Sequence, residues 1–305
     1  MRFAKLHGLG NSYVYIDLVT QPEPAIDWPA LARRVSDPGF GIGSDGLILI
    51  LPSDRADLRM RMFNADGSEG EMCGNGIRCL ARYAADTGLI QGNRLQVETL
   101  AGVRHLELIR RGDSVAAVRV DMGEPRLKPA EIPVALVQAQ AGDGVRAPDR
   151  YDGPLVDAPL PVDGEIYRVT AVSMGNPHCV LLVGDVNDAP VRTLGPRIER
   201  HPAFPQGVNV EFIQVVDGRH LRMRVWERGS GETYACGTGA CAAAVATHLL
   251  NLTGRRVTVH MVGGDLEVEW ASDGHVYMSG PCETVCTGEL SDEWLRSNSG
   301  LGRHP

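Results

Sequence analysis

Two cysteines, Cys73 and Cys236, occupy corresponding places in two similar stretches and are the residues best suited to chemistry. Residues 72–84 read MCGNGIRCLARYA and residues 235–247 read ACGTGACAAAVAT, so each cysteine directly precedes Gly-x-Gly and a helix-like segment. Free backbone N–H groups at a helix start can hold a carboxylate, and they lower the pKa of a nearby thiol. We therefore expect each motif to supply a reactive thiol and a set of anion-binding donors.

Two such thiols around one carbon atom could work as a base and an acid. Ionising one thiol disfavours ionising the other, so the pair populates a thiolate beside a thiol. That state suits removal of a proton from one face of a carbon and delivery of a proton to the other face. A single cysteine in a glycine-rich turn is more often a small buried hydrophobe, and a duplicated structural cysteine is the simpler alternative.

The likeness between the two stretches continues upstream. Residues 58–61 and 221–224 both read LRMR, and their offset of 163 residues (221 − 58) equals that of the two cysteines (236 − 73). HGLGNSYVYID at 7–17 likewise echoes SMGNPHCVLLVGD at 173–185. We infer an internal duplication, in which two like halves bring the cysteines face to face across a pseudo-two-fold axis.

Length and composition indicate a two-domain protein of the cytoplasm. The 305 residues fit two domains, which we place at 1–122 together with a returning tail at 281–305, and at 123–280. A net charge of −8 offers no basic face for nucleic acid. The chain shows no apolar leader and no membrane-length apolar run, so no membrane partner is expected. Seven cysteines, an odd number, argue against a secreted disulfide framework.

Local patterns predict the elements that would position the cysteines. We expect helices at 24–37, entered through Asp27, and at 77–87, ended by Gly88. A third helix at 240–250 is apolar nearly all round and alanine-rich, which predicts a buried helix that a sheet can wrap closely. Alternating strands fill most of the remaining chain, residues 124–165 form a crossing and surface excursion, and the tail returns as a strand to the first half.

Three long motifs together resemble those of diaminopimelate epimerases. They are FNADGSEGEMCGNGIRC (63–79), GNPHC (175–179) and ERGSGETYACGTGAC (227–241), and QGVNVEF (206–212) helps to extend the likeness over nearly the whole chain. Members of that family are cofactor-independent enzymes that interconvert LL- and meso-diaminopimelate on the route to lysine and peptidoglycan. The resemblance implies an α+β fold of two pseudo-symmetric halves, each a curled mixed or antiparallel sheet around a central helix, with the active site in the cleft between them.

The resemblance also assigns roles to residues of this chain, with no cofactor and no metal. Cys73 and Cys236 would be the acid–base catalysts, and His178 and Glu227 would tune their pKa values. The implied substrate-binding residues are Asn11, Asn64, Gly74, Asn75, Asn176, Asn209, Glu227, Arg228, Gly237 and Thr238. Those in the glycine motifs would offer backbone N–H groups to the reacting carboxylate, and Arg228 would grip the distal one. Taken singly, each polar residue is as easily a turn, core or solvated residue.

One departure from the family pattern and three alternatives stay open. Many members carry Asp-Gln-Leu with a substrate-contacting Gln where this chain has Asp45-Gly46-Leu47, so that contact is absent or replaced. The nearest alternative is a proline racemase or hydroxyproline epimerase of the same fold. The others are a metal-binding or redox protein that uses its cysteines as ligands or as a disulfide, and a non-catalytic binding protein. The expected partner is a small amino acid, and a homodimer is left open.

Overall fold

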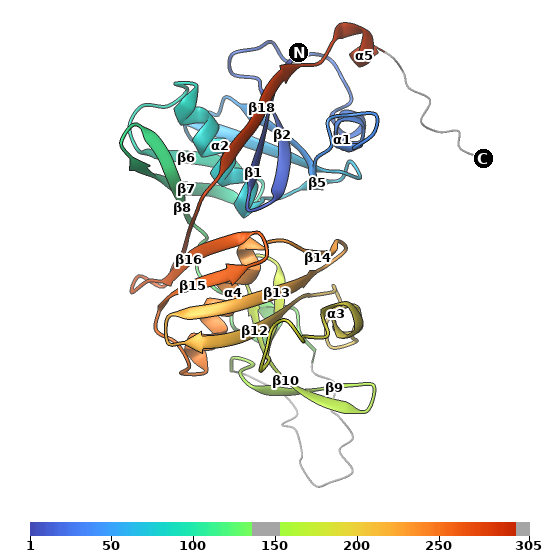
Figure 1. Cartoon of the computed structure of the whole chain (residues 1–305), viewed down its shortest axis with the longest axis vertical. Helices are drawn as coiled ribbons and strands as arrows, with labels where there is room; N and C mark the ends of the chain where they lie inside the picture. Colours follow the sequence, from blue (N-terminus) through green and yellow to red (C-terminus); the bar gives the residue numbers. More distant parts are fainter. Residues whose placement is uncertain (136–152, 297–305) are drawn as a thin grey trace, which may run out of the picture. The chain divides into compact units, whose positions relative to one another are not determined.

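The computed structural model of the protein describes residues 1–135 and 153–296, which divide into two compact units. The first unit contains Met1–Leu108 and the segment that begins at Cys282, and the second contains Ile109–Pro281 (Figure 1). The boundary lies earlier than residue 122, because β8 (Ser114–Asp121) pairs antiparallel with β17 (Val276–Gly280) of the second unit.

The described residues of the first unit form strands interrupted by three helices. In chain order they are β1 (Arg2–Gly8), β2 (Asn11–Asp17), α1 (Trp28–Ser36), β3 (Gly46–Leu51), β4 (Leu58–Asn64), β5 (Glu69–Gly70), α2 (Gly74–Asp86), β6 (Arg94–Thr99), β7 (Gly102–Arg111), β18 (Glu283–Glu289) and α5 (Asp292–Arg296).

The second unit begins with β8 and a short 3-10 turn at Pro129–Glu131, and then has a similar order of strands and helices. Its further elements are β9 (Ala158–Val162), β10 (Glu165–Ser173), β11 (Pro177–Leu182), α3 (Val191–Glu199), β12 (Asn209–Asp217), β13 (His220–Glu227), β14 (Gly231–Thr233), α4 (Gly237–Leu249), β15 (Arg256–Met261), β16 (Gly264–Trp270) and β17.

The strands of each unit form a mixed region of sheet, and the two regions have matching strand orders. The first runs β18–β1–β2–β3–β4–β6–β7, with parallel pairs β2/β3 and β4/β6. The second runs β9–β10–β11–β12–β13–β15–β16–β17–β8, with parallel pairs β11/β12 and β13/β15. The strand from the end of the chain, β18, therefore gives the first sheet the edge that β9 gives the second.

Helix positions confirm the internal duplication. Helices α1 and α3 are offset by 163 residues at both ends, and so are α2 and α4 (191 − 28 and 237 − 74). An ion pair is repeated as well, because Arg61 binds Glu69 and Arg224 binds Glu232, both at 2.7 Å. The same residues thus recur at the same offset in sequence, in secondary structure and in contacts.

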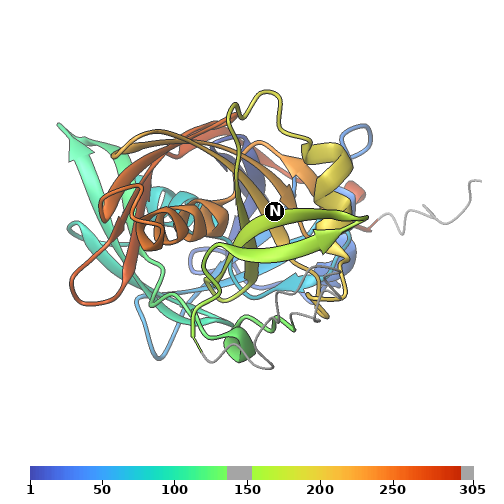
Figure 2. The same ribbon diagram turned by 90° about the horizontal axis from the view of Figure 1, so that it is seen from below.

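Each sheet carries one helix on each face. In the first unit α2 packs against β1, β2 and β18, while α1 packs against β3 and β4. In the second unit α4 contacts β10, β11, β12, β15, β16 and β17, and the strands curve around it in Figure 2. Its alanines at 240, 242–244 and 246 are buried, which confirms the expectation of an all-round apolar central helix. The α+β fold with a sheet curled around a helix in each half is therefore confirmed.

The predicted helices are present: α1 starts later than residue 24, and α2 and α4 start earlier than the apolar pattern indicated. Helix α1 is capped by Asp27, whose side chain accepts from the Ala30 N–H, as expected. Helices α2 and α4 begin three residues before 77 and 240, because the glycine motifs themselves form their first turns. The excursion expected at 124–165 lies partly outside the described residues. In the part of the chain that the structure describes, no helix is long and apolar enough to cross a membrane.

Candidate active site: a thiol at the start of each central helix

Cys73 is the N-cap residue of α2. Its backbone is extended, and its sulfur accepts a hydrogen bond from the Gly76 N–H at 3.3 Å. Gly76 permits this close turn, because a Cβ there would lie 2.6 Å from Cδ1 of Ile48. Backbone N–H groups in the first turn of a helix are suited to binding an anion.

Polar side chains from β2 and α2 surround the Cys73 sulfur. The thiol donates to Oδ1 of Asn11 at 3.4 Å, and the same oxygen accepts from Asn75 at 3.4 Å. Asp45 in turn accepts from the Asn11 amide at 3.0 Å, which fixes the orientation of that amide. Burial, reinforced by the nearby thiol, raises the pKa of the Tyr13 hydroxyl well above its usual value.

The structure thus brings Asn11, Cys73 and Asn75 together and adds Asp45 and Tyr13, which the sequence reading did not single out. The repeat carried a signal for Tyr13, because it follows Asn11 as His178 follows Asn176.

A buried cation, Arg78, lies on the same helix. Its side chain is fully buried and donates to the Gly74 carbonyl at 3.3 Å. Burial lowers its pKa, while the thiols of Cys79, Cys282 and Cys73 act in the opposite direction. The interior charge close to the first thiol is therefore positive.

Asn64 is the last residue of β4 and takes no part in the contacts described above for Cys73. Its amide donates to the Ser68 hydroxyl at 2.9 Å, within the turn that leads to β5. The side chain therefore stabilises that turn and keeps its amide oxygen available as an acceptor.

Cys236 repeats the geometry of Cys73 at the start of α4. Its backbone is extended, and its sulfur accepts from the Gly239 N–H at 3.4 Å. The Thr238 hydroxyl lies 3.5 Å from the sulfur and can be either donor or acceptor. Unlike Cys73, which is half-buried, Cys236 is buried. Gly237 and Thr238 form the first turn, as Gly74 and Asn75 do in α2.

The expectation that the motif lowers its thiol pKa is wrong for Cys236. Burial raises its pKa well above the ordinary thiol value, and the charges of Glu227 and Glu211 raise it further. The hydrogen bonds from Thr238 and Gly239 act in the opposite direction but do not outweigh this effect. Burial and the two carboxylates therefore favour the protonated form of the Cys236 thiol.

A chain of hydrogen bonds leads from the interior of the second sheet to the Cys236 sulfur. Nδ1 of His178 lies 2.6 Å from Oε1 of Glu211, and Nε2 lies 3.0 Å from Oδ1 of Asn176. The Asn176 amide then donates to the Thr238 hydroxyl at 3.3 Å. Sequence reasoning had assigned His178 and Asn176 but missed Glu211, which lies in the quoted motif QGVNVEF.

Glu227 and Arg228 follow one another at the end of β13. Burial raises the pKa of Glu227, partly offset by hydrogen bonds from Thr233 and Cys236. The Arg228 N–H donates to Oδ1 of Asn209 at 3.0 Å, and its guanidinium donates to the Gln206 carbonyl at 3.0 Å. Asn209 therefore holds the turn that presents Arg228, since its own amide is tied to the Pro177 carbonyl at 2.9 Å.

Gly46, where many diaminopimelate epimerases carry Gln, has no room for a side chain. A Cβ on Gly46 would lie 2.1 Å from the Phe63 carbonyl oxygen and 2.9 Å from the Tyr13 ring. Because the first of these neighbours is backbone of the paired strand β4, it cannot turn away. The departure from the pattern is thus built into the strand pairing.

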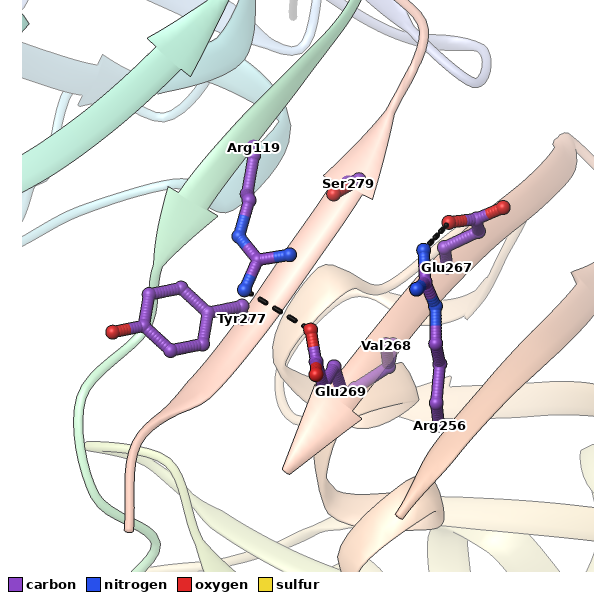
Figure 3. Close-up of a pocket in the computed structure, with 7 residues that line it drawn as sticks. All are labelled: Arg119, Arg256, Glu267, Val268, Glu269, Tyr277 and Ser279. Atoms are coloured by element: carbon purple, nitrogen blue, oxygen red, sulfur yellow. Dashed lines mark hydrogen bonds and ion pairs between the residues drawn. The ribbon is translucent and has the colours of Figure 1, made fainter. Parts of the chain in front are cut away.

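The hollow drawn in Figure 3 lies elsewhere, over β8, β15, β16 and β17. Two ion pairs fill it, Arg119 with Glu269 at 3.0 Å and Arg256 with Glu267 at 2.9 Å. Glu267 and Glu269 alternate along β16 with the buried Leu266 and Val268, so they point away from the packed interior. Since these charges are mutually neutralised, the hollow has little to offer a charged substrate.

The alternative of a metal-binding or redox protein that uses its cysteines finds little support in the geometry. All seven cysteines are free thiols; Cys282 is buried against α2, where Arg82 binds its carbonyl, whereas Cys286 is exposed on β18. Across residues 1–135 and 153–296, no group of three or more His, Cys, Asp or Glu side chains is arranged to hold a metal ion.

Solved structures with the same fold define the class to which this architecture belongs. A hydroxyproline epimerase from Agrobacterium vitis matches with a TM-score of 0.66 and 15% identity, over 95% of this chain and 90% of that chain. A phenazine biosynthesis protein of the PhzF family from Bacillus anthracis matches with a TM-score of 0.65 and 15% identity, over 95% and 99% of the two chains. The chain thus has the duplicated α+β fold that these proteins share.

Sequence relatives narrow the class to one family. The family model described as diaminopimelate epimerase matches residues 3–128 and 170–285. The diaminopimelate epimerase of Moorella thermoacetica is 57% identical over 95% of this chain and 99% of its own length. That of Pelotomaculum thermopropionicum is 53% identical over 95% and 98% of the two chains. The chain belongs to the diaminopimelate epimerase family, whose members are isomerases.

Proposed function

We propose that this protein interconverts LL- and meso-2,6-diaminopimelate by a two-base mechanism, in the synthesis of lysine and peptidoglycan precursors. The observation that carries the proposal is the pair of equivalent cysteines, each the N-cap of a central helix in a duplicated fold. The full-length similarity to curated diaminopimelate epimerases supports the choice of substrate.

The reacting carboxylate would bind at the two helix starts. The N–H groups of Gly74 and Asn75, and of Gly237 and Thr238, lie in the first turns of α2 and α4, where backbone donors point out of the helix end. Donors held in place before the reaction stabilise negative charge as it develops, so the same groups would favour the carbanion-like transition state. No cofactor is needed if these donors and the two thiols carry the reaction.

Proton transfer would run between the two sulfurs through the α-carbon. Because Cys236 is held as a thiol, we assign it as the acid of the resting enzyme and Cys73 as the thiolate base. Cys73 then removes the α-proton from one face while Cys236 delivers its proton to the other. Turnover leaves Cys73 protonated and Cys236 ionised, which is the state required for the reverse reaction.

The distal amino-acid end distinguishes diaminopimelate from cyclic substrates. Arg228 presents a guanidinium suited to a carboxylate, and its presentation by Asn209 supports that role. Asn64 and Glu227 would contact the distal ammonium group. Asn11 lies beside the Cys73 thiol, and Asn176 lies beside the Thr238 hydroxyl. Proline and hydroxyproline lack a second amino-acid end that would use Arg228.

The setting of the enzyme follows from its chemistry. Both thiols must stay reduced, so we place the protein in the cytoplasm, acting alone or as a homodimer on a free amino acid. A cleft between the two units, with both sulfurs at one carbon, is part of this proposal.

Proton NMR in deuterated water tests the proposal directly. The reduced protein is incubated with LL-diaminopimelate, and in parallel with L-proline. We expect loss of the α-proton signal and appearance of the meso isomer with diaminopimelate only. Exchange on proline alone would keep the two-thiol mechanism and overturn the substrate, and no exchange on either compound would overturn the epimerase assignment.

A further inference from the structure

Glu211 is a fully buried carboxylate that the two-thiol mechanism does not by itself require. Its residue is 0% exposed, and Oε1 contacts His178 at 2.6 Å. The other oxygen, Oε2, is buried without a hydrogen-bond partner. Leaving a buried carboxylate oxygen unsatisfied is costly, so the presence of Glu211 at this position calls for a reason beyond packing.

The first half of the chain shows what the fold needs at this position. Glu211 corresponds to Ile48 of the first half, because the two positions are 163 residues apart (211 − 48). Glu211 pairs with Val180 in its sheet, as Ile48 pairs with Tyr15. A Cβ placed on Gly76 would lie 2.6 Å from the Ile48 side chain. A Cβ placed on Gly239 would lie 2.8 Å from Oε1 of Glu211. An aliphatic side chain therefore fills the site in one copy, which shows that the architecture itself does not demand a carboxylate.

The carboxylate lies next to the catalytic thiol of its own unit. Oε1 of Glu211 and the Cys236 sulfur are 2.8 and 3.2 Å from the same point, the would-be Cβ of Gly239. In the first copy the buried charge on the central helix is the cation Arg78, whose place in α4 is taken by Cys241. The two thiols are thus flanked by interior charges of opposite sign.

The hydrogen bonds of this group have a defined order. The Asn176 amide donates to Thr238, so its oxygen faces Nε2 of His178 and makes that nitrogen a donor. The other ring nitrogen, Nδ1, is hydrogen-bonded to Oε1 of Glu211 at 2.6 Å. With Asn176 held in this way, the Thr238 hydroxyl stays at the Cys236 sulfur, where it can accept from a thiol or donate to a thiolate.

We propose that Glu211, paired with His178, is a positioning residue for the second thiol: it fixes the order of the His178–Asn176–Thr238 chain, and its charge keeps Cys236 protonated in the free enzyme. The idea deepens the proposed function and rests on it for its catalytic meaning. The other titratable neighbours are Glu227 from β13, which acts in the same direction, and Cys179 from β11, whose buried thiol is neutral.

The test is the pH dependence of alkylation in a Glu211→Gln variant of the full-length, reduced protein. Iodoacetamide labelling of Cys236 and Cys73 is followed in one sample by peptide mass spectrometry. Gln keeps the shape and a hydrogen bond to His178 but removes the negative charge. We expect the Cys236 midpoint to fall by about one pH unit or more, so that labelling below the midpoint becomes about tenfold faster, with Cys73 unchanged.

A second variant, Glu211→Ile, places in the second copy the residue that the first copy carries. It removes the charge and also frees His178, so it should lower the Cys236 midpoint and reduce kcat more than Glu211→Gln does. An unchanged Cys236 midpoint in whichever of the two variants folds would overturn the proposal. Because labelling needs no substrate, this failure is distinct from a failure of the wild-type protein to epimerise diaminopimelate.

Discussion

At the scale of single residues, two thiols with the same backbone geometry have different surroundings. Both sulfurs accept a hydrogen bond from the third residue of their helix. Cys73 is half-buried among amides, whereas Cys236 is buried beside Glu227 and Glu211. A reaction that needs one thiol and one thiolate gains from this difference, because the protons need not be distributed by chance.

Glu227 provides a prediction on pH dependence. Its charge raises the pKa of Cys236, and the alkaline limb of kcat/KM reports the loss of that thiol proton in the free enzyme. In Glu227→Gln the pKa of Cys236 falls, so the alkaline limb should move to lower pH by about one unit. The measurement is kcat/KM for LL-diaminopimelate as a function of pH.

Glu232 is the matched control for that experiment. It is held by Arg192 and Arg224, and its substitution by Gln should leave the alkaline limb in place. If Glu227→Gln and Glu232→Gln behaved alike, the limb would not belong to Cys236.

At the scale of elements, the strands next to the central helices set the limits on substitution. In the first unit β3 lies between β2 and β4, and its first residue, Gly46, faces the Phe63 carbonyl at the end of β4. A Gln at that position cannot contact substrate without moving a strand. In this chain the choice of residue at position 46 is therefore constrained by the pairing of β3 with β4.

Gly46→Ala tests that coupling. The new methyl group would meet backbone at 2.1 Å, so we expect a loss of about 3 kcal/mol or more in unfolding free energy, measured by urea titration. Gly88→Ala is the control, because Gly88 has φ +75° with open space around it and should cost only about 1 kcal/mol. Equal losses for the two variants would show that the contact with Phe63 relaxes.

Much of this organisation could be predicted from sequence, and the missed parts have a common cause. The two glycine motifs and the 163-residue offset identified both cysteines, both central helices and the duplication. Glu211, Asp45 and the order of the hydrogen bonds could not be derived, because they depend on pairing between strands that are distant in the chain. The thiol pKa was misjudged for the same reason: the helix start is local in sequence, but the carboxylates that outweigh it come from β12 and β13.

At the scale of the whole molecule, the last strand of the chain completes the first unit. Strand β18 pairs along the length of β1, from Arg2 with Glu289 onward, and the N-terminal ammonium donates to the Leu290 carbonyl at 2.9 Å. Leu290 also joins the buried cluster under α1. The stability of the first unit therefore depends on residues at both ends of the sequence.

Truncation after Pro281 tests this dependence. Without β18, strand β1 loses a neighbour, so we expect amide protection to be lost across β1 and β2 while the strands of the second unit keep theirs. Hydrogen exchange read by mass spectrometry resolves the two units. A chain that ends at Arg296 retains β18 and should be protected throughout; normal protection of β1 in the shorter chain would contradict the prediction.

The pairing of β1 with β18 also has a consequence for biosynthesis. The second unit is one continuous segment, so it can complete its sheet soon after its last strand leaves the ribosome. The first unit is translated earlier yet keeps an open strand edge until β18 has been made. A premature stop codon between Pro281 and β18 would therefore release a chain whose older half is unfinished and exposed to misassembly.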